Sequence, residues 1–205
     1  MSKLRLAAAS VLIVATGSFF WSCASTPAIA ATGPAHPIVL KIENANGGWG
    51  SGVVVADDWV LTCRHVLPAV RAGDFDVKHQ VPHLTKDLAL LLVPGVKANG
   101  LRIAGEPAEL HQDLFAYGWH LGDHFVKTRG FQGLNPELMS APVIHGCSGG
   151  AVTDARGQLL GIITWVVYTG TANGWDGYAL PHVSGYTPLG QKELDWISDM
   201  QQLHD

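Results

Sequence analysis

The chain has 205 residues, of which 47% are hydrophobic and 15% are charged, and its formal net charge at pH 7 is -4. A slightly acidic chain without a run of Lys or Arg offers no basic surface to a polyanion, so we expect no nucleic-acid partner. Few charges combined with 24 glycines and 11 prolines favour an all-β domain over a helical bundle.

The first thirty residues have the pattern of an export signal. Lys3 and Arg5 precede a long uncharged apolar stretch, and Ala28–Ala30 forms a small-x-small cleavage pattern. We therefore expect residues 1–30 to be a signal peptide or membrane-anchoring segment. Residues 31–205 are expected to form one exported domain, secreted or periplasmic.

Cys23 leaves a second route of processing open. It follows Ser22 and precedes small residues, as the lipid-carrying cysteine of a bacterial lipoprotein does. In that case a lipid on Cys23 would hold the domain at a membrane; otherwise only the N-terminal segment would touch one. Both routes place the domain outside the cytoplasm.

Short apolar and β-branched runs, separated by Gly, Pro, Asn and Asp, predict a domain of many short strands. The pairs of turn residues at Asp57-Asp58 and Asp154–Gly157 predict hairpin turns. From Leu189 to Leu203 the apolar residues recur every three or four positions, which predicts one C-terminal helix. The expected strands are residues 38–42, 52–56, 59–62, 88–93, 114–118, 124–130, 150–153, 159–167 and 177–180.

Three residues occur in contexts that nucleophilic catalysis needs. His65 follows an expected strand, Asp87 precedes another, and Ser148 lies in the glycine-bounded loop Gly146–Gly150. A serine hydroxyl needs a base to take its proton, a neutral imidazole can do so at pH 7, and a carboxylate can orient that imidazole. Glycine at position 146 lets the backbone N–H groups of Gly146 and Ser148 point at one spot, where an oxyanion would form.

These segments resemble the motifs of the trypsin-like (chymotrypsin-fold) serine proteases, especially the compact bacterial Deg/HtrA-like members. Leu61–Val66 is similar to the family's histidine motif, Asp87–Leu91 to its aspartate motif, and Gly146–Gly150 to its Gly-x-Ser-Gly-Gly motif. The three motifs follow one another in the family's order, and the resemblance extends over residues 48–200. We expect the protease domain without a PDZ extension.

The resemblance implies an all-β fold of two six-stranded Greek-key β-barrels packed together, with a short C-terminal helix. It also implies a monomeric serine endopeptidase that cleaves protein or peptide substrates through an acyl-enzyme, without a cofactor. His65 would be the general base, Asp87 the residue that orients it and Ser148 the nucleophile, with an oxyanion hole formed by Gly146 and Ser148. We expect one ring nitrogen of His65 to bond the Ser148 hydroxyl and the other to bond Asp87.

The same resemblance assigns residues to substrate binding. No acid stands at the implied base of the primary specificity pocket, so we expect cleavage after small or medium apolar residues rather than after Lys or Arg. Asp176 is the acid that could reach this pocket from its far wall. The implied substrate-binding residues are Pro142 at the base, Val143 beside it, His145 at the mouth, Thr164 and Trp165 on the strand that lines the substrate, and Tyr178–Pro181 closing the pocket.

Three alternatives stay open. A catalytically silent trypsin-like fold acting as an extracytoplasmic binding module would keep the same segments. Cys63 and Cys147 could form a disulfide, although two buried free thiols are favoured. Several histidines could bind a metal, although their spacing gives no single ligand face, so we expect no metal site; these are His79, His83, His111, His120 and His124.

Overall fold

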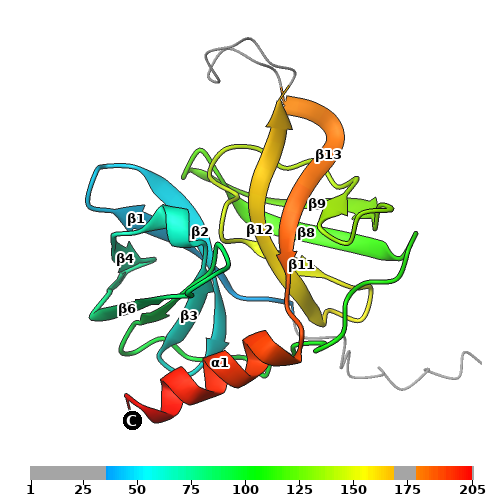
Figure 1. Ribbon diagram of the computed structural model, residues 1–205. Coiled ribbons are helices and arrows are strands. Elements are labelled where there is room, and N and C mark those ends of the chain that lie inside the picture. The colour runs from blue at the N-terminus through cyan, green and yellow to red at the C-terminus, as the bar shows by residue number, and fades with distance from the viewer. Residues whose placement is uncertain (1–35, 169–178, 205) are drawn as a thin grey trace, which may run out of the picture. The chain divides into compact units, whose positions relative to one another are not determined.

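The computed structural model describes residues 36–168 and 179–204 (Figure 1). Within these residues the chain folds into strands that form two antiparallel sheets, followed by one α-helix. The strands are β1 (Val39–Asn44), β2 (Trp49–Ala56), β3 (Trp59–Thr62), β4 (Ala69–Ala72), β5 (Phe75–Asp76), β6 (His79–Pro82), β7 (Ala89–Leu92), β8 (Asp113–His120), β9 (His124–Phe131), β10 (Leu138–Met139), β11 (Ala151–Thr153), β12 (Leu159–Tyr168) and β13 (Ala179–Pro188).

The first sheet has the strand order β5-β4-β1-β2-β3-β7-β6. Val53 on β2 pairs with Leu61 on β3, which pairs in turn with Leu90 on β7, and all three side chains are fully buried. They belong to one apolar core with Ile42. Because burying a Val or Leu side chain stabilises a fold by ~1.5–3 kcal/mol, this row of contacts fixes the register of the three strands and which of their faces points into the core.

The second sheet has the strand order β10-β13-β12-β11-β8-β9. Its core contains the buried side chains of Leu114, Met139, Ile163 and Tyr186. The Tyr186 hydroxyl donates a hydrogen bond to the side-chain oxygen of Gln132 inside this core. Burial raises the pKa of Tyr186 to about 12, so this hydroxyl stays protonated in neutral solution.

The two sheets curl beside each other, and β8 of the second sheet contacts β1 and β2 of the first (Figure 1). The Trp119 indole N–H on β8 donates to the Val39 carbonyl on β1 over 2.9 Å. The Trp119 backbone N–H donates to the hydroxyl of Ser51 on β2 over 2.8 Å. Trp119 of β8 is therefore hydrogen-bonded to two strands of the neighbouring sheet, β1 and β2.

The helix α1 spans Gln191–Gln202 and lies along the first sheet (Figure 1). Its buried Ile197 packs into the first core, with Trp196 and Met200 beside it. Glu193 accepts the Gly190 backbone N–H over 2.9 Å and the Lys86 ammonium over 2.7 Å, so the helix start is tied to the residue before Asp87. Among the residues described, no helix combines the length and apolar character that a membrane crossing needs.

The expected fold class is confirmed: the structure is mostly β, with two curled half-barrel sheets and a short C-terminal helix. The first sheet has seven strands instead of the expected six, because the two-residue strand β5 pairs with β4. The expected turns at Asp57-Asp58 and Asp154–Gly157 join β2 to β3 and β11 to β12.

The sequence pattern missed β4, β5, β6 and β10, and it ended β13 too early. The missed strands have four residues or fewer, so side-chain alternation carries little signal in them. Strand β13 continues to Pro188 through Pro181 and Gly185, which normally end strands. It can do so because β10 pairs only with Ser184 and Gly185, so no strand among the described residues pairs with the proline positions on that side.

Candidate active site

His65 and Asp87 meet at one end of two neighbouring strands. β3 pairs with β7 so that Thr62 stands opposite Ala89. His65 lies in the short turn Arg64–Val66 that follows β3, and Asp87 lies just before β7. Because antiparallel strands run in opposite directions, the residue after one strand comes beside the residue before the other.

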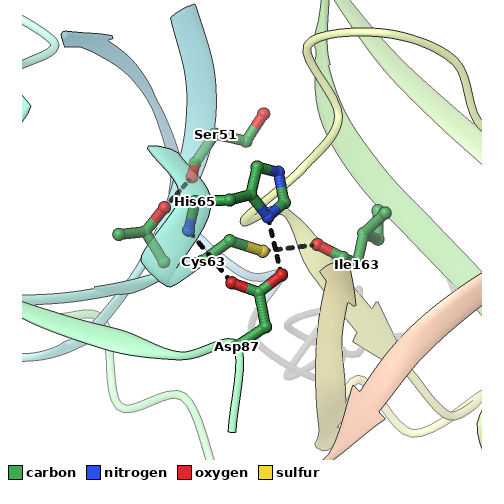
Figure 2. Close-up of polar contacts among 6 residues, drawn as sticks. Ser51, Cys63, His65, Asp87 and Ile163 are labelled. Carbon is green, nitrogen blue, oxygen red and sulfur yellow. Dashed lines mark hydrogen bonds and ion pairs between the residues drawn. The ribbon is translucent and has the colours of Figure 1, made fainter. Parts of the chain in front are cut away.

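The carboxylate of Asp87 holds His65 at two points (Figure 2). One oxygen lies 2.6 Å from the ring Nδ1, and the other accepts the His65 backbone N–H over 3.0 Å. The prediction that Asp87 contacts a His65 ring nitrogen is confirmed. The contact leaves Nε2 as the ring nitrogen that faces away from Asp87, and 48% of the His65 side chain is exposed.

The electrostatics of Asp87 favour its ionised form. Partial burial works to raise the pKa of this carboxyl, but the ring and backbone hydrogen bonds from His65 and the positive charge of Arg64 outweigh it. The net result is a pKa below the ordinary value of an aspartate. An ionised carboxylate at Nδ1 keeps the ring proton on that nitrogen.

The Ser148 loop is held mostly through its backbone. The Ser148 carbonyl accepts the Ser51 N–H over 2.7 Å, and the Gly149 N–H donates to the Ile163 carbonyl over 2.7 Å. Gly149 has φ +88°, and a Cβ there would overlap the Ser51 carbonyl and the Thr62 hydroxyl. Only glycine fits at this position, both in conformation and in space.

The Ile163 carbonyl connects the two halves of the site. It accepts the Gly149 N–H from the serine loop and the Cys63 thiol from the end of β3, the latter over 3.0 Å (Figure 2). Cys63 stands two residues before His65, so one carbonyl of the second sheet binds both the histidine side and the serine side. Within the described part of the chain, the Ser148 hydroxyl makes no hydrogen bond to His65, contrary to expectation.

The backbone before Ser148 leaves two N–H groups unused. Cys147 N–H donates to the Ile144 carbonyl over 3.1 Å, and Gly146 has φ +91°, which together define a type II turn. In residues 36–168 and 179–204, the N–H groups of Gly146 and Ser148 donate to no protein acceptor. Two donors this close together, one in the turn and one directly after it, can bind a single negatively charged oxygen.

The residues expected to bind substrate have different surroundings. Pro142 and His145 are exposed, and Val143 is buried in the second core. Thr164 is buried, whereas 40% of Trp165 is exposed and its ring covers the backbone of Gly185. The structure therefore brings Val143 and Thr164 inside the second half-barrel and leaves the other three at its surface.

The segment expected to close the specificity pocket, Tyr178–Pro181, lies only partly within the described residues. Tyr178 and Asp176 lie outside the described residues, and Ala179 stands opposite Tyr168, away from Trp165. The residues opposite Trp165 and the following position are Gly185 and Ser184.

Ser51 was not among the predicted site residues, although its hydroxyl donates to the Gly146 carbonyl over 2.8 Å. The signal was present, because Ser51 stands between Gly50 and Gly52, as a residue does where two backbones approach closely. The second missed contact, from the Leu121 N–H to the His145 carbonyl over 3.0 Å, involves a backbone donor that no side-chain pattern marks.

Cys63 and Cys147 are free thiols and both are fully buried, which confirms the favoured expectation. Burial, aided by the charge of Asp87, raises the pKa of Cys63 well above its usual value. Burial also raises the pKa of Cys147, against a backbone hydrogen bond at Ile144.

One group of possible metal ligands lies in the described residues: Cys63, His65 and Asp87 place ligand atoms within 4.8 Å of one another. The His65 nitrogen and the Asp87 oxygen are only 2.6 Å apart. An ion bonded to both at about 2.0–2.2 Å in tetrahedral geometry needs them farther apart, so this pair is arranged for a shared proton. His120 pairs with His124 across the β8–β9 turn, without a third ligand beside them among the described residues.

Two curled antiparallel sheets, with a His–Asp pair on one and a glycine-bounded serine loop beside the other, define the chymotrypsin-fold class. The sequence matches the family of the trypsin-like peptidase domain over residues 50–162, which is more than half of the chain. The chain belongs to this family.

Two curated relatives carry protease names. Serine protease Rv3671c of Mycobacterium tuberculosis H37Rv is 28% identical over 169 residues, covering 68% of this chain and 42% of the relative. The periplasmic pH-dependent serine endoprotease DegQ of Escherichia coli K12 is 28% identical over 174 residues, covering 73% of this chain and 38% of the relative. The chain therefore spans less than half of the length of these relatives.

Solved structures give the same fold. The active form of the Rv3671c protease from M. tuberculosis has a TM-score of 0.59 at 22% identity, covering 95% of this chain and 92% of that chain. The serine endoprotease from Yersinia pestis has a TM-score of 0.63 at 20% identity, covering 82% of this chain and 63% of that chain. At these identities the likeness concerns the fold alone.

Proposed function

We propose that this chain is a serine endopeptidase in which Ser148 is the nucleophile, His65 the general base and Asp87 the residue that orients the base. The observation that carries the proposal is the pair of hydrogen bonds between the Asp87 carboxylate and both the ring and the backbone N–H of His65, beside the glycine-bounded Ser148 loop. The hydrogen bond to the ring assigns the ring proton to Nδ1 and leaves Nε2 able to accept a proton from a serine.

In the proposed reaction the Ser148 oxygen bonds to the substrate carbonyl carbon while its proton passes to Nε2 of His65. The carbonyl oxygen becomes an oxyanion that accepts hydrogen bonds from the N–H groups of Gly146 and Ser148. The C–N bond then breaks, the imidazolium gives its proton to the leaving amine, and an acyl-enzyme remains. Water then attacks the acyl-enzyme in the same way, with His65 taking its proton and returning it to Ser148. The carboxylic acid product leaves, and Ser148 is free again.

A second function, a catalytically silent binding module, is favoured by one observation: the Ser148 hydroxyl is not hydrogen-bonded to His65. Catalytic hydrogen bonds are often long in unliganded enzymes and tighten when substrate binds, so this observation does not outweigh the Asp87 geometry. An active serine should react with a fluorophosphonate probe, whereas a silent module should not.

Labelling of the purified domain with that probe, followed by peptide hydrolysis, tests the proposal. We expect labelling of wild type and none of Ser148→Ala. We also expect hydrolysis by Ser148→Ala to be about 10⁶-fold slower, as for nucleophile deletions in other serine proteases. Folded wild-type protein that neither labels nor cleaves would favour the binding module.

The proposed substrates are proteins or peptides, cut by a monomer after small or medium apolar residues. Neither Pro142 nor Val143, the residues implied at the base of the pocket, carries a carboxylate, so a basic substrate side chain would be left unpaired there. A peptide-library cleavage profile tests it. A profile dominated by Lys or Arg before the cut would contradict it and direct attention to Asp176.

We also propose export of the domain, with residues 1–30 as its signal and Ala31 as its first residue. The charged start, the apolar stretch and Ala28–Ala30 support this, as does the word periplasmic in the name of the relative DegQ. N-terminal sequencing of protein recovered outside the cytoplasm should begin at Ala31. A lipid on Cys23 would show the other processing route, and a soluble cytoplasmic form starting at Met1 would contradict both.

A further inference from the structure

Ser51 is a fully buried residue of β2 whose hydroxyl bonds two backbones. It accepts the Trp119 N–H over 2.8 Å and donates to the Gly146 carbonyl over 2.8 Å. A serine hydroxyl has one hydrogen to donate, so with Trp119 as the donor on one side, that hydrogen points to Gly146. Ser51 thereby ties the peptide that follows Gly146 to both sheets.

The peptide that precedes Gly146 is held by a separate donor. The Leu121 N–H, in the turn between β8 and β9, donates to the His145 carbonyl over 3.0 Å. In a trans peptide the carbonyl and the N–H point in opposite directions. A bond that draws the His145 carbonyl toward Leu121 therefore directs the Gly146 N–H away from that turn, where no described protein group accepts it.

The β8–β9 turn is itself firmly placed. Leu121 and Gly122 both have positive φ, +48° and +76°, and the ring of Trp49 lies against Gly122. Gly146 packs so closely on the turn that a Cβ there would overlap the Trp119 carbonyl. Trp119 in turn is anchored to β1 and β2 by its two N–H groups. The loop, the turn and the first sheet form one packed unit.

We propose that Ser51 is a positioning residue. Together with the Leu121 N–H, it keeps the oxyanion-binding loop, before substrate arrives, in the conformation in which the Gly146 N–H points away from the β8–β9 turn. The proposal rests on the proposed peptidase function, because it concerns the donors that would bind the oxyanion. Preformed donors stabilise the transition state without reorganisation during the reaction. A loop that had to rearrange would lower the rate of the chemical step and leave ground-state binding unchanged.

The kinetic test compares Ser51→Ala with Thr153→Val. Both changes delete a fully buried hydroxyl, but among the described residues the Thr153 hydroxyl has no hydrogen-bond partner. We expect Ser51→Ala to lower kcat by about 10- to 100-fold with little change in KM, less than the ~10²–10³ that deleting an oxyanion donor costs. Ser51→Cys, with a weaker donor of similar size, should fall between wild type and Ser51→Ala.

A second measurement separates positioning from a general loss of structure. Affinity for a peptidyl trifluoromethyl ketone, whose serine adduct carries an oxyanion, should fall in Ser51→Ala by the same factor as kcat/KM. Affinity for the cleaved product peptide should not change. Thr153→Val should behave as wild type in both assays. Equal kinetics for Ser51→Ala and Thr153→Val would overturn the proposal.

Amide hydrogen exchange tests the loop without any requirement for activity. In Ser51→Ala we expect faster exchange at Cys147, whose N–H closes the turn on Ile144, and unchanged exchange at Gly149, whose N–H bonds Ile163. Unchanged exchange at Cys147 would refute the positioning role. If wild type formed neither product nor ketone adduct, the peptidase function would fail, and the exchange result would still decide how the loop is held.

Discussion

The histidine side and the serine side of the candidate site are built in different ways. His65 and Asp87 are placed by the ends of two paired strands and joined by side-chain hydrogen bonds, and both are partly exposed. The serine side is placed by backbone bonds to Ser51, Leu121 and Ile163, at glycines with positive φ. Side-chain chemistry thus defines one half, and backbone conformation defines the other.

The largest effect on the histidine side should come from Asp87→Asn. An amide would donate to Nδ1 and force the ring proton onto Nε2, so His65 could not accept a proton from Ser148. We expect kcat to fall by about 10⁴-fold with the fold retained. Steady-state hydrolysis, with circular dichroism for folding, measures both quantities.

Asp113→Asn is the matched control for Asp87→Asn, because it neutralises an exposed aspartate on β8 that pairs at 2.9 Å with Arg129 on the edge strand β9. Its hydrolysis rate should equal that of wild type. A rate for Asp87→Asn close to that of the control would remove Asp87 from the proposed mechanism.

The serine side should be most sensitive to Gly149→Ala. The new methyl group would overlap the Ser51 carbonyl and the Thr62 hydroxyl. The alanine would also have to adopt φ near +88°, which is strained for a residue with a side chain. Gly47→Ala is a matched variant, because Gly47 has φ +79° and open space around the position of a Cβ. The two variants share the strain in φ and differ in the steric overlap.

We expect Gly47→Ala to cost about 1–2 kcal/mol of unfolding free energy, the usual penalty for a left-handed residue with a side chain. Gly149→Ala should cost more and also reduce hydrolysis. Each kcal/mol lowers Tm by about 2–4 °C in a domain of this size, so thermal unfolding resolves the difference. Equal Tm values for the two variants would contradict the predicted steric cost, because they would show that the serine loop moves to accommodate the methyl group.

The smallest effect concerns Glu193, which supports the histidine side from the helix. Burial works to raise the pKa of Glu193, but its hydrogen bond to Lys86 and the Gly190 N–H lower it overall. A carboxyl with a lowered pKa in the folded state stabilises the fold above its unfolded pKa of about 4.3, and this contribution is lost as pH falls through the folded value.

Glu193→Gln should therefore lower Tm at pH 7, and its difference from wild type should shrink toward pH 3. Thermal unfolding at several pH values measures this difference. Asp57→Asn, which removes an exposed pair with Lys97, should change Tm little at any pH. A Tm difference for Glu193→Gln that stayed constant with pH would mean that the carboxylate charge is not what ties α1 to Lys86.

The sequence predicted the side-chain half of the site better than the backbone half. The strand ends that bring His65 to Asp87 follow from apolar runs, and their contact is confirmed. The contacts of Leu121 and Ile163 use main-chain groups, which every residue type shares, so no residue pattern could indicate them. The middle of β13 was missed for a related reason, because Pro181 and Gly185 normally end a strand.

The two buried thiols can serve as chemical probes of local opening, one in each half of the site. Cys63 lies on the histidine side and Cys147 directly precedes Ser148, and neither thiol is accessible to solvent. An alkylating reagent can react with them only after local or global opening, at a rate that follows the free energy of that opening. Different labelling rates at the two cysteines would show that one side of the site opens without the other.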